Sequence, residues 1–192
     1  AAGSGVYKRQ VRRVTTITGL PADLVRAAHG RIDEAQFARE FQRAKGRVLS
    51  TYDASIAGTD PEPSHARPAS ADPFLAALRA PLSLGMTQLL TTHLATRERN
   101  YIVANEDAFE HWDWGHDGGM PESVTALRRV LALDPQMRVF AVHGFQDLQT
   151  PYFETKLILD QFGDLAGARI LRKTYPGGHM FYSRDASRAA FA

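Results

Sequence analysis

Residues 121–192 alternate between helical and strand periods of hydrophobicity, and this order limits the fold more than any other feature of the chain. The pattern predicts helices at 122–133 and 151–162, strands at 137–142 and 168–175, and a last helix that begins at Ser183 or Asp185. Strands that alternate with helices pair in parallel. The sequence therefore predicts an α/β fold, with 137–142 as a strand buried on both faces and with Phe153 and Leu157 facing inward.

The first 120 residues have a different, mostly helical pattern. We predict helices at 21–29, 33–44 and 73–96, with Pro21 at a first helical position and Asp33 as an N-cap. Residues 47–52 form a short extended segment, and the glycine and prolines of 57–72 predict a linker without regular structure. We therefore expect a helical lid or cap region over 11–120 and the sheet-bearing core over 121–192.

Both ends of the sequence suggest a fragment. Residues 5–10 resemble a translated adaptor remnant, so residues 1–10 are expected to take no part in the fold. The last residues read as an uncapped helix. We therefore expect the missing N-terminal part of the same protein to be a partner of this chain.

Composition excludes several classes of protein. The 23 basic and 21 acidic residues leave a net charge of +2, so no strong field for nucleic acid or an anionic membrane is expected. The chain has no cysteine, which excludes a thiolate zinc site and a cysteine nucleophile. No apolar run is long enough to span a bilayer. We expect no cofactor, no nucleic-acid partner and no membrane partner.

Asp147 follows the first predicted strand of the core and precedes a helix. Ligands of open α/β sheets bind outside the carboxyl ends of the strands, so Asp147 lies where functional residues gather. Thr150, followed by Pro151, is the better placed helix cap, which leaves Asp147 available for another role. A turn or capping aspartate remains an alternative.

His179 follows the second predicted strand, in the segment Pro176-Gly177-Gly178-His179. Two glycines after a proline make an open, sharply bent loop that can present the imidazole at the edge of the sheet. An incidental surface histidine in a turn is the alternative. Taken together, an acid after one strand and a histidine after the next match the α/β-hydrolase order Ser, Asp, His.

The two blocks resemble the C-terminal half of the serine carboxypeptidase family, especially its bacterial members. GFQDLQTP ends at Pro151, and YPGGHMFY begins 24 residues later. Weaker similarity extends the resemblance to roughly residues 20–192, at Gly30-Arg31-Ile32, Tyr52-Asp53, Asp72-Pro73 and Trp112-Asp113-Trp114-Gly115.

The resemblance implies a partial α/β-hydrolase fold and release of C-terminal amino acids from peptide substrates through an acyl-enzyme. Asp147 would orient His179, His179 would be the general base, and Met180 would line the pocket for the departing residue. A family member of this kind is expected to be periplasmic or secreted.

The nucleophile elbow G-x-S-x-G does not occur in the sequence. Ser83 is the nearest candidate, but a proline replaces the first glycine and the residue lies in a helical pattern. The isolated chain is therefore expected to be inactive. Two other hypotheses stay open: another α/β-hydrolase, such as an esterase or aminopeptidase, and a non-catalytic hydrolase-like binding protein.

A second polar cluster lies in the segment 111–117. Two histidines and two aspartates there could meet around a divalent ion, but they lack strict helical spacing, and a solvated or substrate-side loop is the alternative. The cluster consists of His111, Asp113, His116 and Asp117. We predict no metal site.

Overall fold

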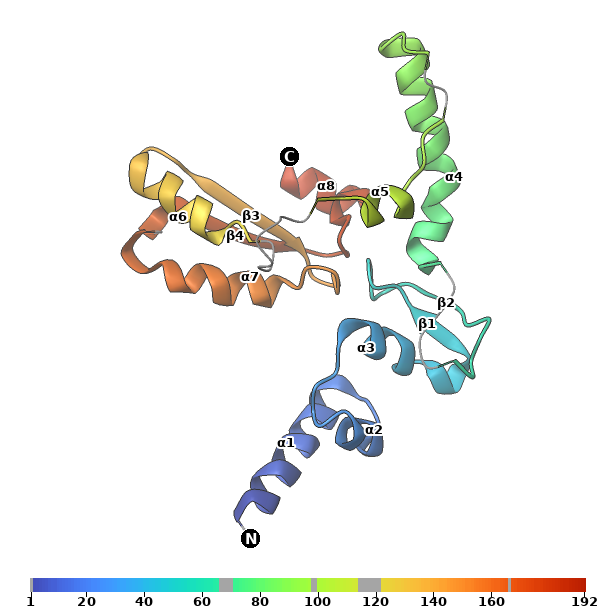
Figure 1. Ribbon diagram of the computed structural model, residues 1–192, viewed down its shortest axis with the longest axis vertical. Coiled ribbons are helices and arrows are strands. Elements are labelled where there is room, and N and C mark those ends of the chain that lie inside the picture. The colour runs from blue at the N-terminus through green and yellow to red at the C-terminus, as the bar shows by residue number, and fades with distance from the viewer. Residues whose placement is uncertain (1, 66–70, 98–99, 114–121, 166) are drawn as a thin grey trace. The chain divides into compact units, whose positions relative to one another are not determined.

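The computed structural model describes residues 2–65, 71–97, 100–113, 122–165 and 167–192 (Figure 1). These residues form a mixed structure of helices and two small sheets, in agreement with the coarse α/β prediction. The α-helices are α1 (Ala2–Thr18), α2 (Ala22–Ala27), α3 (Glu34–Glu40), α4 (Pro73–Gln88), α5 (Glu106–Glu110), α6 (Val124–Leu133), α7 (Tyr152–Leu159) and α8 (Asp185–Phe191). The strands are β1 (Arg47–Leu49), β2 (Ala57–Thr59), β3 (Val139–Gly144) and β4 (Ile170–Tyr175). Short 3₁₀ turns are η1 (Arg43–Lys45), η3 (Asp160–Leu165), η4 (Gly167–Arg169) and η5 (Phe181–Ser183), and η2 (Leu89–His93) is π-helical.

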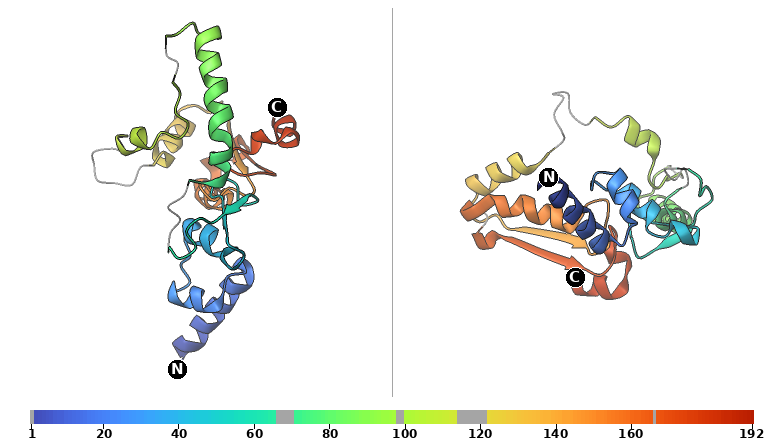
Figure 2. Two further views of the ribbon diagram at one scale, coloured as in Figure 1. Left: turned by 90° about the vertical axis from the view of Figure 1, so that its right-hand side faces the viewer. Right: turned by 90° about the horizontal axis from the view of Figure 1, so that it is seen from below.

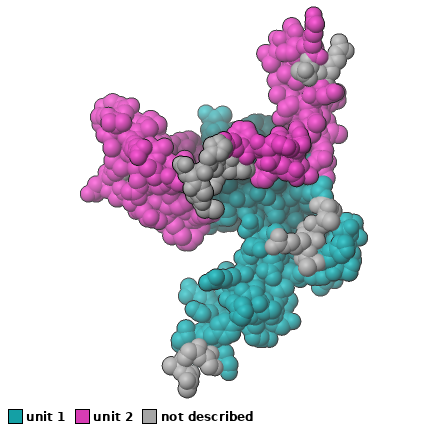
Figure 3. Space-filling view, in the orientation of Figure 1, with its two compact units in different colours: residues 1–75, 143–152, 174–192 teal, residues 76–142, 153–173 magenta. Residues whose placement is uncertain are grey.

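The chain divides into two compact units, which are described separately (Figure 3). Unit 1 contains residues 1–75, 143–152 and 174–192, and unit 2 contains 76–142 and 153–173. The expected division into a helical lid or cap region over 11–120 and a sheet-bearing core over 121–192 stays a prediction.

The described N-terminal residues of unit 1 belong to the fold, so the expectation that this segment takes no part in it is wrong for residues 2–10. Residues 2–18 form α1, and Tyr7 packs against an apolar cluster of Val11, Leu20 and Val25. The Tyr7 hydroxyl also donates a hydrogen bond to the carbonyl of Arg26 at 3.0 Å. The amphipathic period of this segment predicts a helix, in contrast to the expectation from its resemblance to an adaptor remnant.

Local signals fix the ends of α2 and α3. Pro21 is the N-cap of α2, one position earlier than predicted. The prediction for Asp33 is confirmed, because its carboxylate accepts a hydrogen bond from the amide of Gln36 at 2.6 Å. Helix α3 ends at Glu40, earlier than predicted, and Gly46 then adopts a left-handed conformation with φ of 65°.

A buried ion pair ties α3 to the segment 60–65. Arg39 and Asp60 are in contact, with side chains 0% and 1% exposed. The Arg39 guanidinium also donates to the carbonyls of Glu62 and His65, at 2.9 Å each. The Nε of Arg39 also donates to the carbonyl of His65, and the second oxygen of Asp60 accepts from the amide of Glu62. Every charged atom in this contact therefore has a hydrogen-bonding partner, as buried charges require.

The segment 57–72 was predicted to lack regular structure, and this is wrong for its first residues. Ala57–Thr59 form β2, which pairs antiparallel with β1. Asp72 then begins α4, because its Oδ1 accepts hydrogen bonds from the amides of Phe74 and Leu75. The same carboxylate accepts from the Ser50 hydroxyl at 2.8 Å, which ties the loop after β1 to this helix end.

In unit 2, α6, α7 and η3 pack on one face of the strands β3 and β4. The cluster there consists of Leu131, Leu159 and Phe162, with Val139 and Ile170 from the strands against it. Both strands run in the same direction, as predicted (Figure 2).

Burial of β3 on both faces is wrong in the described structure. Phe140, on the face away from this cluster, is 45% exposed, and Phe153 and Leu157 of α7 are also exposed. The described helices cover one face of this sheet, so side chains that point to the other face or to the outer side of α7 remain in solvent.

The long helix predicted for 73–96 ends earlier as an α-helix. Helix α4 stops at Gln88 and continues as the π-helical turn η2, where Thr91 and Thr92 donate side-chain hydrogen bonds back to carbonyls. Ser83 lies inside α4, away from any strand-to-helix turn, in agreement with its rejection as a nucleophile. None of the described helices is long and apolar enough to cross a bilayer.

Candidate active site

Hydrogen bonds that extend the pairing of β3 and β4 connect the loop after β3 with the loop after β4. The amide of Phe145 donates to the carbonyl of Tyr175, and the amide of Gln146 donates to that of Gly177, each at 2.8 Å. The Gln146 side chain accepts the amide of Gly177 in return, also at 2.8 Å. The two loops that carry Asp147 and His179 are therefore fixed to each other through the main chain.

Two glycines allow this close approach. A Cβ at Gly144 would overlap with the backbone of Gly177 and Gly178. A Cβ at Gly178 would overlap with the backbone of Tyr52 and Asp53. Gly178, directly before the histidine, is therefore needed for packing as well as for the bend.

Asp147 organises its own turn. Its Oδ1 accepts hydrogen bonds from the amides of Gln149 and Thr150, at 2.8 and 3.0 Å, and its Oδ2 accepts from the Thr150 hydroxyl at 2.7 Å. The prediction that Thr150 would cap the helix was wrong, because its hydroxyl is used by Asp147 and α7 begins at Tyr152. Asp147 thus both stabilises its own turn and accepts a hydrogen bond from His179. The interpretation as a turn aspartate and the interpretation as the partner of the histidine are therefore compatible.

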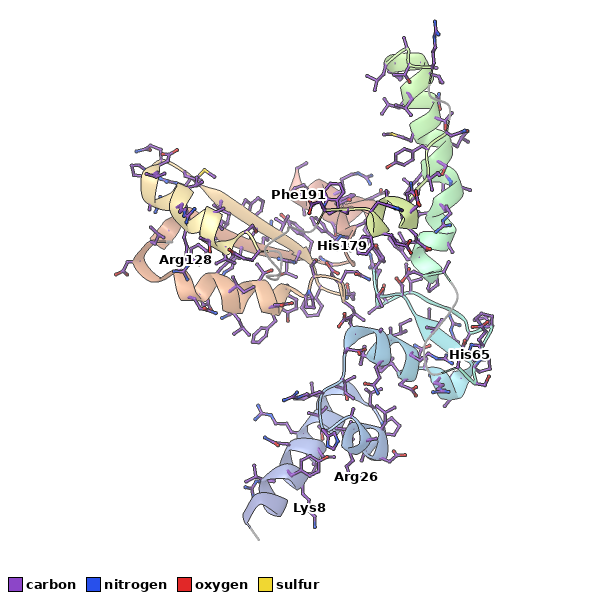
Figure 4. All side chains as sticks on the ribbon, in the orientation of Figure 1. Lys8, Arg26, His65, Arg128, His179 and Phe191 are labelled. Atoms are coloured by element: carbon purple, nitrogen blue, oxygen red, sulfur yellow. The ribbon has the colours of Figure 1, made fainter. Side chains whose placement is uncertain are left out.

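The structure brings Asp147 and His179 together. His179 Nδ1 lies 3.0 Å from Asp147 Oδ2, and also 3.3 Å from the Thr150 hydroxyl. The side chain of Asp147 is 3% exposed and that of His179 is 41% exposed. Figure 4 labels His179, which follows the carboxyl end of β4. A buried carboxylate thus holds one edge of an imidazole that remains accessible from solvent.

The loop between β1 and β2 supplies a third side of the site, which the sequence did not predict. The amide of His179 donates to the carbonyl of Tyr52 at 2.6 Å, and the Tyr52 ring meets the imidazole edge to face, with centroids 5.5 Å apart. The side chain of Gln149 donates to Thr51 at 2.7 Å. This loop therefore contacts both the aspartate turn and the histidine.

Asp53 is a second buried carboxylate at this position. It accepts hydrogen bonds from the amide of Gly178 at 3.1 Å and from Arg184 at 2.8 Å. Burial raises its pKa, but hydrogen bonds from Ser55 and Arg184 outweigh burial and leave the pKa below its ordinary value. The stabilisation from ionised Asp53 is therefore present above the ordinary value of 3.8 and is lost as the pH falls through the lower pKa of the folded state.

An aromatic cluster supports the histidine loop from α8. Tyr175 and Phe181 are stacked with centroids 4.9 Å apart, and Phe191 meets both rings edge to face. The buried Ser187 hydroxyl donates to the carbonyl of Pro176 at 2.6 Å. Helix α8, which the sequence predicted as a terminal helix and no more, thus holds the loop before His179.

Two neighbouring residues complete the surroundings. Met180, the predicted pocket residue, is half-buried and is the N-cap of η5. Its role toward a departing residue stays a prediction. His143 Nδ1 lies 3.1 Å from the carbonyl of Thr150, which can accept but not donate, so Nδ1 carries the proton and the bond closes the turn around Asp147.

The polar cluster at 111–117 is described in part. His111 Nδ1 lies 2.8 Å from the carbonyl of Asp107. Within the described ranges, no three His, Asp or Glu side chains gather in a way that could hold a metal ion. Trp114, His116 and Asp117 lie outside the described residues.

The geometry around His179 defines its chemistry. An ionised carboxylate accepts hydrogen bonds and cannot donate them, so Nδ1 of His179 carries the proton shared with Asp147. In the neutral imidazole the lone pair then lies on Nε2. The arrangement is a carboxylate-oriented imidazole that can take a proton at Nε2 and be stabilised as the imidazolium by Asp147.

Comparison with protein families, with curated proteins and with solved structures found no match for this chain.

Proposed function

We propose that this chain supplies the aspartate and histidine of a serine-type carboxypeptidase with a partial α/β-hydrolase fold. The observation that carries the proposal is the 3.0 Å contact between Asp147 Oδ2 and His179 Nδ1, after the ends of two neighbouring parallel strands. The resemblance of GFQDLQTP and YPGGHMFY to serine carboxypeptidases favours this activity over other hydrolases.

In the proposed reaction, His179 Nε2 takes the proton of a serine hydroxyl as its oxygen attacks the carbonyl of the last peptide bond. The same nitrogen then protonates the departing amino group, which leaves an acyl-enzyme. Water attacks the acyl carbonyl, Nε2 takes the proton from that water, and the proton returns to the serine oxygen as the ester bond breaks. Asp147 keeps the imidazole in the required tautomer and stabilises each imidazolium state.

The serine is proposed to come from a part of the protein outside these 192 residues, because the sequence contains no G-x-S-x-G. In this proposal Met180 lines the pocket for the departing residue. The activity belongs to the whole protein, and the isolated chain is expected to hydrolyse nothing.

The test is hydrolysis by the protein expressed from its complete reading frame. The substrates are an N-blocked dipeptide with a free carboxylate, the same peptide as an amide, an acetate ester, and an amino-acid anilide with a free amino group. We expect cleavage of the free-carboxylate peptide and covalent labelling by a fluorophosphonate. Asp147→Asn should lower kcat by about 10⁴-fold, because the imidazole loses its tautomer. His93→Gln, at an exposed histidine of η2, is the control and should leave kcat unchanged.

Other results would overturn the proposal in defined ways. Cleavage of the ester or anilide without the peptide indicates another α/β-hydrolase, such as an esterase or aminopeptidase. A protein that is neither labelled nor able to cleave any of the four substrates would be a non-catalytic binding protein. Peptidase activity of the purified 192-residue chain contradicts a triad completed from outside it.

A further inference from the structure

Asp53 holds both ends of the loop that carries His179. Its Oδ2 accepts hydrogen bonds from the amide of Gly178, directly before the histidine, and from the guanidinium of Arg184, five residues after it. Its Oδ1 accepts from the amide of Ser55 at 3.0 Å and from the Ser55 hydroxyl at 2.5 Å. One carboxylate therefore fixes the start and the end of the segment 178–184.

The backbone of His179 is held by the same short loop. The amide of Gly178 bonds to the Asp53 side chain, and the next amide, that of His179, bonds to the carbonyl of Tyr52. Two successive peptide groups are thus oriented by two successive residues. The direction of the imidazole depends on this backbone. A substitution at Asp53 is therefore expected to alter the hydrogen bond between His179 and Asp147, although Asp53 contacts neither side chain of that bond.

The charge of Asp53 matters for this arrangement. The side chain is buried, and Arg184 is its charged partner and is partly exposed. A carboxylate accepts both the amide of Gly178 and the guanidinium, and such charge-assisted bonds are about twice as strong as neutral ones. The depressed pKa of Asp53 agrees with an ionised group here.

We propose that Asp53, paired with Arg184, is a positioning residue for His179, which keeps the imidazole on Asp147 by fixing both ends of the segment 178–184. The geometric part of this inference concerns the 192-residue chain itself. Its consequence for catalysis rests on the proposed function.

The experiment measures the Nδ1 proton of His179 by NMR in this chain, through its downfield resonance and its exchange rate with water. Arg184→Gln is the main variant because the Arg184 side chain is partly exposed, so the fold should survive. We expect exchange to become about tenfold faster, the factor for loss of one charge-assisted bond. The urea midpoint should also fall, because Asp53 stays buried with only the bonds from Gly178 and Ser55. Asp53→Asn should have the larger effect, and Arg184→Lys, which keeps the charge, a smaller one.

The matched control is Arg43→Gln. The Arg43 side chain is 35% exposed, close to the 40% of Arg184, and it pairs with Glu40 and donates to the carbonyl of Pro63, not to the segment 178–184. This variant should leave the exchange rate of the His179 proton unchanged. A role of Arg184 in stability alone would move the urea midpoint without accelerating this one proton.

Asp147→Asn separates this inference from the proposed function. If it removes the resonance while Arg184→Gln and Asp53→Asn leave the exchange rate unchanged, the positioning role is wrong and the Asp147–His179 pair stands. If the wild-type chain has no such resonance, or if Asp147→Asn leaves it unchanged, both proposals are wrong. In the complete protein, Arg184→Gln should lower kcat about tenfold with KM nearly constant, because misplacement of a catalytic group affects the chemical step.

Discussion

The surroundings of Asp147 and His179 in unit 1 and the helix-covered sheet face in unit 2 are held by different kinds of interaction. Among the described residues, all the buried polar or charged ones belong to unit 1: Arg39, Ser50, Asp53, Asp60, Asp147 and Ser187. The core of unit 2 is a cluster of Leu131, Leu159 and Phe162. Its ion pairs, such as Lys156 with Asp160, are exposed.

The difference follows from what each region must fix. Apolar burial has no direction, so it brings layers together and tolerates small shifts of atoms. A hydrogen bond between buried groups defines both a distance and an angle, and leaving one unpaired is costly. The region with the imidazole is thus built from interactions that fix single atoms. The sheet layer needs no such precision.

The largest effect is expected from Gly144→Ala, which tests the close approach of the loops after β3 and β4 in unit 1. The new Cβ would overlap with the backbone of Gly177 and Gly178, which cannot rotate away as a side chain can. We expect a loss of more than about 3 kcal/mol in the free energy of unfolding, measured by urea denaturation with far-UV circular dichroism.

Gly85→Ala is the control from unit 2. It lies in α4 with open space around its Cβ position, so alanine should be neutral or stabilise by up to about 1 kcal/mol. Equal stability of the two alanine variants would contradict the close approach of the two loops at Gly144.

Next in size is the buried pair of Arg39 and Asp60. Arg39→Met leaves a carboxylate buried without its charge partner, which costs about 3–5 kcal/mol. The double variant Arg39→Met/Asp60→Asn removes both charges and should recover most of this loss. Arg43→Gln in η1 breaks a less buried pair with Glu40 and should cost at most about 1 kcal/mol.

The stability of the double variant relative to Arg39→Met tests this prediction. If Arg39→Met/Asp60→Asn is no more stable than Arg39→Met, the cost comes from lost packing of the arginine stem and not from an unpaired charge.

In unit 2, Leu131→Ala should cost roughly 2–5 kcal/mol, because the side chain is 1% exposed and its removal leaves a cavity. Leu133, two positions later on the same helix, is 84% exposed, and Leu133→Ala should change stability by less than about 0.5 kcal/mol. Similar effects of the two variants in urea denaturation would contradict the described face of α6.

The period of hydrophobic residues predicted the helices and strands of unit 2 well, because helices and strands each have a characteristic period that is visible in the local sequence. Helix α6 and strand β4 were found close to the predicted residues, and the positions of Asp147 and His179 after neighbouring strands predicted that they would meet. What the period could not predict is which face stays in solvent, since Phe140 is as apolar as a buried residue.

The site in unit 1 was predicted less completely, for a physical reason. The bond from Gly178 to Asp53 joins residues 125 positions apart, and no local pattern indicates it. Strand β2 has three residues, including a glycine, and resembles a linker in composition. The only signal in the sequence at Tyr52-Asp53 was the weak family resemblance, which implied no role for these residues.

The smallest effect is expected from Thr150→Val, which removes one hydroxyl from the Asp147 turn. Oδ2 of Asp147 would lose the bond from Thr150 and keep the contact with His179. We expect a loss of at most about 1 kcal/mol in the free energy of unfolding, because Oδ2 keeps the bond from His179 and is not left without a donor. With fewer donors on Oδ2, the bond from His179 should strengthen, and its Nδ1 proton should resonate further downfield. Thr150→Ser keeps the hydroxyl and should leave the resonance in place. A downfield shift in Thr150→Ser as large as in Thr150→Val would show that the methyl group, and not the hydroxyl, sets the contact between Asp147 and His179.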